Sequence, residues 1–66
     1  MNKKAIGQKL KELRGEKTMK EVSEKIGISI SALGMYETGQ RVPNDNIKKA
    51  LAKYFNTTVE NIFFAE

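Results

Sequence analysis

The 66-residue sequence contains no cysteine and no histidine. The first absence excludes disulfide bonds and thiolate metal sites, and the second removes the side chain that most often serves as a metal ligand or a general base. Eight carboxylates remain as catalytic material, and most of them are interleaved with lysines in a pattern typical of a solvated helix surface. We therefore expect no enzyme activity, no metal and no cofactor.

Long apolar runs are also missing. No segment approaches the ~18 apolar residues that span a membrane, and no signal-peptide pattern opens the chain. With 39% hydrophobic residues the chain can form one thin core, so we expect a single domain over residues 1–66 without a deep cavity for a small-molecule substrate. A cytoplasmic protein without a membrane partner is expected.

The charge is basic and unevenly distributed. Twelve Lys and Arg against eight Asp and Glu give a net charge of +4, and the excess lies wholly in residues 1–26. Such a surface suits a polyanion, either nucleic acid or an acidic membrane face. The early lysines either bind phosphates or only keep a helix face solvated, and we favour the second interpretation for Lys3, Lys4, Lys9 and Lys11.

Apolar spacing and capping residues predict an all-α fold of five helices, with no strand pattern. The first helix runs from Lys3 to Arg14, and Gly7 inside it indicates the close approach of a neighbouring backbone. The later helices are each expected to follow a capping residue, namely Thr18, Ser29, Asn44 and, in a capping box with Glu60, Thr57. The fourth helix has the clearest apolar period, carried by Ile47, Ala50, Leu51 and Tyr54.

The second and third helices have the spacing of a helix-turn-helix. Counted from Met19 as the first position, the fifth residue is the small Ser23, which lets the next helix cross close by, and the ninth is Gly27, which makes a left-handed turn without penalty. The positions that must face the core are all apolar, namely Val22, Ile26, Ile28, Leu33 and Tyr36. An ordinary helical corner without a role in DNA binding would show the same pattern.

Beyond this motif, three segments carry a wider pattern, namely Leu10–Arg14, Ile28–Pro43 and Ala52–Phe64. The pattern as a whole spans residues 3–64. Together they resemble the lambda-repressor-like, Cro and Xre family of phage and conjugative-element regulators. The resemblance implies a homodimer that binds double-stranded DNA at a palindromic operator, with the third helix in the major groove and the two half-sites about one helical turn apart. A transcriptional regulator, and more specifically a repressor, is expected.

Carried over residue by residue, the resemblance implies DNA contacts from Thr18, Met19, Ser29, Ile30, Ser31, Ala32, Met35, Gln40, Arg41 and Asn44. Backbone amides at Thr18 and Met19 would meet a phosphate at a helix N-terminus. Gln40, Arg41 and Asn44 would flank the groove and contact the DNA backbone. Asn44 has an equally good interpretation as a helix cap alone.

The base-reading positions depart from the family pattern. Relatives commonly carry glutamine where Met19 stands, and arginine, glutamine or asparagine at the positions held here by Ile30, Ser31, Ala32, Gly34 and Met35. None of these side chains forms a bidentate contact with guanine or adenine. Our hypothesis is that Ile30, Ala32 and Met35 contact thymine methyl groups, that Ser31 forms adaptable hydrogen bonds, and that DNA shape supplies much of the selectivity.

An apolar outward face also fits a protein interface. The alternative function is therefore a protein-interaction module, such as an accessory factor or an antitoxin-like partner. The fifth helix could also form a protein interface. A core this thin cannot bury every aromatic residue of the chain, so at least one of Phe63 and Phe64 should be exposed. We expect a symmetric dimer contact there, formed by Ile62, Phe63 and Phe64. A different protein partner would explain the exposed ring equally well.

Two charged residues have structural interpretations. Arg14 and Glu37 match the ion pair that links the first and third helices in the resembled family, so we expect them to orient the third helix. Tyr36 is expected to pack against the first helix rather than to stack on a base.

Overall fold

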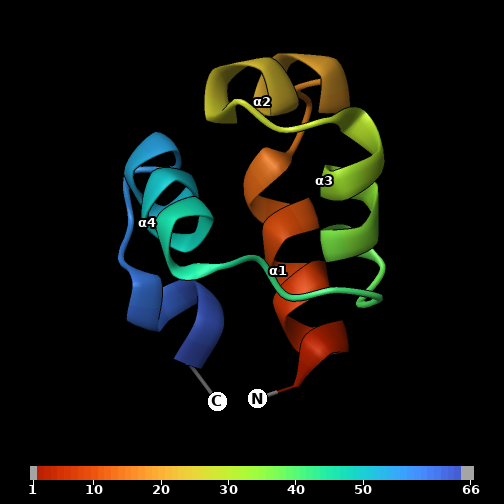
Figure 1. The fold of residues 1–66 in the computed structure, drawn as a ribbon. Coiled ribbons are helices and arrows are strands. Elements are labelled where there is room, and N and C mark those ends of the chain that lie inside the picture. Colours follow the sequence, from red (N-terminus) through yellow and green to blue (C-terminus); the bar gives the residue numbers. More distant parts are fainter. Residues whose placement is uncertain (1, 65–66) are drawn as a thin grey trace.

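The computed structural model describes residues 2–64, which form the helices α1 (Lys3–Arg14), α2 (Met19–Ile26), α3 (Ile30–Glu37) and α4 (Asp45–Tyr54) and the π-helix η1 (Glu60–Phe64). The described residues contain no strand, and the all-α, five-helix prediction is confirmed. α1 packs against both α3 and η1, and α2 packs against α3 and α4 (Figure 1). No helix in this part of the chain has the length and apolar character needed to cross a membrane.

Side-chain caps fix the start of every α-helix. In each case a side-chain oxygen accepts a hydrogen bond from the amide three residues later, which satisfies a donor that the helix itself leaves free. The donor amides and their acceptor side chains are Ala5 and Asn2 (3.1 Å), Glu21 and Thr18 (3.1 Å), Ala32 and Ser29 (3.0 Å), and Ile47 and Asn44 (2.9 Å). The predicted caps Thr18, Ser29 and Asn44 are therefore confirmed.

The cap of the last helix was predicted one residue too early. The amide of Asn61 donates to Thr58 Oγ1 at 3.1 Å, so Thr58 is the cap, while Thr57 Oγ1 accepts from the side-chain amide of the same asparagine at 3.2 Å. Before this point the chain passes through Asn56 at φ 56°, a left-handed residue that the prediction did not include. The wider π-helical turn then directs two consecutive side chains, Ile62 and Phe63, into the core.

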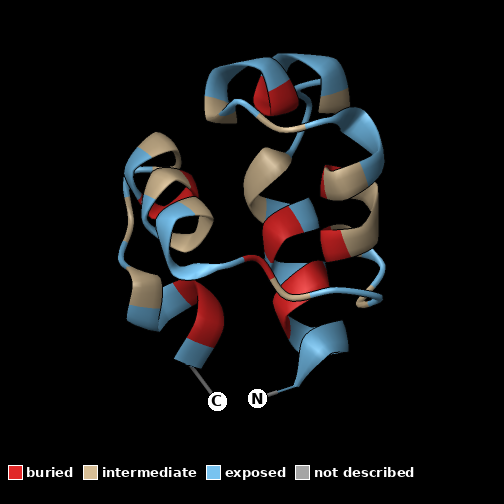
Figure 2. Ribbon diagram, viewed as in Figure 1, coloured by how far each residue is buried: buried red, intermediate tan, exposed pale blue. Residues whose placement is uncertain are grey.

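One core joins α1, α3, α4 and η1 (Figure 2). Its buried members are Ile6, Leu10, Tyr36, Leu51, Ala52, Ile62 and Phe63. The contact of Tyr36 with the core is as predicted. The stripe predicted for the fourth helix was only partly right, because Ala52 is buried while Ile47, Ala50 and Tyr54 are half-buried. α4 contacts α2 as well as the core, so its buried surface is wider than a single stripe.

Gly7 is the point at which α1 and α3 meet. A Cβ atom at this position would lie 2.7 Å from the carbonyl oxygen of Tyr36, a distance that real Cβ atoms do not show, and it would also overlap the carbonyl oxygen of Glu37. The predicted close backbone approach is thus confirmed. The absence of a side chain at Gly7 sets the distance between α1 and the C-terminal end of α3.

Candidate nucleic-acid interface

The turn between α2 and α3 is built as the spacing predicts. Gly27 has φ 85° and ψ 33°, a left-handed conformation in which other residues are strained. The side chain of Ser23 is buried and donates to the carbonyl oxygen of Lys20 at 3.1 Å. The backbone amides of Gly27 and Ile28 both donate to the carbonyl oxygen of Ser23, at 2.8 and 3.0 Å, and they fasten the turn to the end of α2.

The inner face of α3 is anchored in the protein interior. Leu33 is 1% exposed, and Val22 of α2 is completely buried. Tyr36 reaches the core cluster, and Ile26 and Ile28 are half-buried against it. All five positions predicted to face inward therefore do so, and α3 has no freedom to rotate about its axis without opening the core.

An ion pair fixes the far end of α3 to α1. Arg14 Nε donates to Glu37 Oε2 at 2.7 Å, and Arg14 Nη2 donates to Glu37 Oε1 at 3.1 Å, which is a bidentate arrangement. The Glu37 side chain is only 6% exposed. The hydrogen bond from Arg14 to this carboxylate raises the pKa of Arg14 above its ordinary value, so the guanidinium stays charged. Arg14 also donates to the carbonyl oxygen of Lys17 at 2.9 Å and thereby ties in the loop before α2.

The outward face of α3 is open in the described part of the chain. Ile30 is 50% exposed, Ser31 is exposed, and Met35 is half-buried at the edge of the same face. Gly34 leaves room there for the Met19 side chain, whose methyl carbon would lie 3.4 Å from a Cβ at position 34. Met19, the first residue of α2, thus lies beside the middle of α3 on one surface.

Two of the residues predicted for this surface make contacts within the protein. Ala32 is half-buried and packs against the core cluster, because it lies on the flank of α3 rather than on its outward face. The hydroxyl of Ser29 accepts the capping hydrogen bond of α3. Ile30, Ser31 and Met35 therefore make up most of the surface that α3 presents.

Sequence reasoning missed Thr38, which extends the same surface. Its side chain is exposed, its hydroxyl donates to the carbonyl oxygen of Gly34 at 2.9 Å, and it accepts from the Gln40 side-chain amide at 3.0 Å. Ser31, Met35 and Thr38 stand at positions i, i+4 and i+7 of one helical face. That spacing was the signal available in the sequence, but the prediction ended the helix face at Met35.

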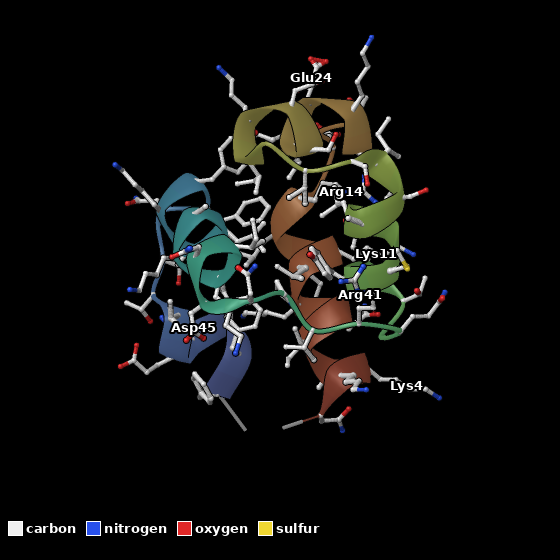
Figure 3. The ribbon with its side chains drawn as sticks, viewed as in Figure 1. Lys4, Lys11, Arg14, Glu24, Arg41 and Asp45 are labelled. Atoms are coloured by element: carbon white, nitrogen blue, oxygen red, sulfur yellow. The ribbon has the colours of Figure 1, made fainter. Side chains whose placement is uncertain are left out.

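The flanking polar residues are exposed where the loop after α3 begins and ends. Gln40, Arg41 and Asn44 are all exposed. Gly39, in the same loop, lies so close to α1 that a Cβ there would be 3.2 Å from the backbone of Lys4. The loop therefore rests on the first turn of α1, and Figure 3 shows Lys4 and Arg41 toward the lower end of α3. At the other end of the face, Thr18 is exposed and caps α2.

The predicted dimer residues divide into two groups. Ile62 and Phe63 are each 3% exposed, because the π-helical turn places both side chains in the core of the chain, and their contact with a second copy stays a prediction. Phe64 is 55% exposed, which confirms that one of the two phenylalanines stays at the surface. The described residues contain no group of three carboxylates close enough to hold a metal ion.

Comparison with known families agrees with this geometry. The model of the helix-turn-helix family matches residues 10–62, well over half of the chain. Comparison with curated proteins and with solved structures gave no match. The matched family is a DNA-binding and non-catalytic one, so it favours a DNA-binding regulator over the protein-interaction alternative. The chain belongs to the lambda-repressor-like and Xre group of helix-turn-helix proteins, which bind double-stranded DNA and regulate transcription.

Proposed function

We propose that this protein is a sequence-specific repressor of the cytoplasm that binds a palindromic operator as a homodimer and inserts the outward face of α3 into the major groove of each half-site. The observation that carries the proposal is the contrast between the two faces of α3. Leu33 on the inner face is 1% exposed, while Ile30 on the outer face is 50% exposed. A helix that is held rigidly and open on one side matches the width of the major groove.

The phosphate contacts follow from the ends of the same surface. The first amides of a helix have no partner within the helix and carry a partial positive charge, so the start of α2 at Thr18 and Met19 suits a phosphate. At the opposite end, Gln40 and Arg41 offer exposed donors, and Asn44 is exposed beside its capping role. These contacts position the protein and do not read sequence.

Base reading falls to apolar contacts. Ile30 and Met35 carry no hydrogen-bond donor that could pair with guanine or adenine, but both can pack against the methyl group of thymine. The half-buried Ala32 supplies a smaller contact at the flank, and Ser31 contributes hydrogen bonds. With few directional contacts, a large part of the selectivity comes from the shape and deformability of the DNA.

DNase I footprinting on the DNA that flanks the gene tests this proposal. We expect a protected site with two-fold symmetry and half-sites separated by about one helical turn. Salt-dependent binding that protects no defined site would reduce the activity to nonspecific binding. A lack of duplex binding would leave the protein-interaction module as the function.

Truncation of the apolar surface should reduce specificity. We expect Ile30→Ala or Met35→Ala to weaken operator binding by roughly 5- to 30-fold, because about 1–2 kcal/mol of contact with a thymine methyl is lost. Binding to an unrelated duplex should change little. Titration of both duplexes by fluorescence anisotropy measures the two effects, and equal losses on both would contradict direct reading by α3.

The same contact can be removed from the DNA. Replacing a contacted thymine with deoxyuridine deletes only the methyl group. On that duplex, Ile30→Ala should cause no further loss, because the two changes remove the same interaction and their free energies are then not additive. If the losses from deoxyuridine and from Ile30→Ala were additive at every thymine of the site, Ile30 would contact no thymine methyl group.

Removal of a phosphate contact should have a different signature. We expect Arg41→Ala to weaken specific and nonspecific binding by similar factors and to reduce the slope of log K against log salt by about 1. Lys53→Ala is the matched control, because Lys53 is an exposed cation on α4, which lies across the molecule from α3 (Figure 1). Equal salt slopes for the two variants would show that Arg41 does not contact DNA.

A further inference from the structure

The helix α3, which the structure describes over its whole length, presents no charged and no amide side chain on its outward face. Its one charged residue is Glu37, whose side chain is 6% exposed and is held by Arg14. The outward face consists instead of the apolar Ile30 and Met35 and the hydroxyl of Ser31. In the major groove, guanine and adenine are read by arginine, lysine, asparagine or glutamine. The outward face of α3 therefore lacks the groups that identify a purine.

The hydroxyl groups of this surface do not separate one pyrimidine from the other. Thymine presents an acceptor, O4, at the place where cytosine presents the amino group N4. The Ser31 hydroxyl can donate or accept as it rotates, so it can meet either base. Thr38 Oγ1 donates its proton to the carbonyl oxygen of Gly34 at 2.9 Å and accepts from Gln40 at 3.0 Å, which leaves it an acceptor position that suits the cytosine amino group. The hydroxyls therefore permit cytosine where they permit thymine.

The remaining groups of the surface suit a methyl group. With about 3.6 residues to a turn, Ile30 and Met35 stand at the two edges of the outward face with Ser31 between them. The end of the Met19 side chain lies beside Gly34 on the same surface, where its methyl carbon would be 3.4 Å from a Cβ. Methionine side chains are flexible and polarizable, so they adapt to a small apolar group. The mark that this surface can detect is thus the methyl group of a pyrimidine.

We propose that the outward face of α3 recognises the C5-methyl group of a pyrimidine, and that the protein therefore binds duplex DNA carrying 5-methylcytosine at positions where it binds thymine. Both bases project this methyl group from the same ring carbon into the major groove. The inference rests on the proposed function and deepens it, because it names the chemical mark that the surface reads. Methylation of cytosine at C5 then strengthens binding wherever cytosine replaces a contacted thymine.

Anisotropy titration of matched operator duplexes tests the inference. Each thymine of the footprinted site is replaced, in both half-sites at once, by deoxyuridine, by cytosine or by 5-methylcytosine, with guanine opposite the two cytosines. Cytosine and 5-methylcytosine form the same base pair, so their comparison isolates the methyl group. Where deoxyuridine weakens binding, we expect 5-methylcytosine to bind roughly 15-fold tighter than cytosine, as for the burial of two methyl groups. Thymine should exceed deoxyuridine by the same factor.

Alanine variants assign the effect to α3. Ile30→Ala and Met35→Ala should each reduce the ratio of the 5-methylcytosine and cytosine affinities to about 1 at the position that the residue contacts, because the methyl group has then lost its partner. Circular dichroism verifies that both variants keep the fold. Arg41→Ala is the matched control, since the loss of a phosphate contact should weaken both duplexes alike and leave their ratio at roughly 15.

Equal affinities for the cytosine and 5-methylcytosine duplexes at every position would overturn the inference. A methyl effect that survives unchanged in both Ile30→Ala and Met35→Ala would also overturn it, because the contact would then lie outside the outward face of α3. The two proposals fail in distinguishable ways. A footprint without a defined site overturns both, whereas a symmetric footprint with equal affinities for the two duplexes overturns only the recognition of the methyl group.

Discussion

Replacing Arg14 with alanine is expected to lower the free energy of unfolding by about 3–5 kcal/mol, the range measured when one partner of a buried ion pair is removed. The substitution leaves the Glu37 carboxylate, which is 6% exposed, without its bidentate partner. It also deletes the hydrogen bond to the carbonyl oxygen of Lys17. Urea denaturation at neutral pH, followed by circular dichroism, measures the loss.

Matched replacements separate the cost of the orphaned charge from the value of the pair. Glu37→Gln should cost less than Arg14→Ala, because the amide oxygen still accepts a hydrogen bond from Arg14 and no buried carboxylate remains. The double replacement Arg14→Met with Glu37→Leu should recover much of the loss, since well-packed apolar groups can substitute for a buried pair. A loss below about 1 kcal/mol for Arg14→Ala would mean that the pair behaves as an exposed salt bridge.

Gly7→Ala is expected to destabilise the protein by about 2–3 kcal/mol even though alanine is the better helix former by about 1 kcal/mol. The added Cβ would stand 2.7 Å from the carbonyl oxygen of Tyr36, and both atoms belong to rigid helices, so α1 and α3 must separate. Because α3 presents the proposed base-reading surface, operator affinity should fall along with stability. Thermal unfolding and anisotropy titration report the two effects.

The control is the same substitution at the other glycine within a helix that has room. At Gly34 a new Cβ would meet only the mobile end of the Met19 side chain, at 3.4 Å. Gly34→Ala should therefore raise the free energy of unfolding by about 0.5–1 kcal/mol, as expected for helix propensity alone. If both variants changed stability in the same direction, the close approach at Gly7 would not limit the packing of α1 on α3.

Features with strictly local causes were accessible from the sequence. Thr18, Ser29 and Asn44 cap their helices because a short polar side chain at that position satisfies an amide three residues on. Gly27 adopts the left-handed conformation that the turn requires. The inward positions of α2 and α3 followed from helical periodicity, and the match of Arg14 with Glu37 followed from family resemblance.

Features that depend on the approach of distant segments were not accessible. The burial of Ile62 and Phe63 requires the π-helical turn of η1, and two adjacent polar residues, Thr57 and Thr58, competed for the cap. Ala52 is buried because α4 contacts two neighbours at once. Ala32 packs against the core cluster because other helices supply the residues around it.

The packing of α1 against η1 has a consequence for synthesis on the ribosome. Ile6 and Leu10, near the start of the chain, share one core cluster with Phe63, near the end of the described residues. Because Ile6 and Leu10 are translated well before Phe63, the apolar face of α1 is fully covered only after Phe63 has left the exit tunnel. A nascent chain stalled before Phe63 will expose that face to chaperones.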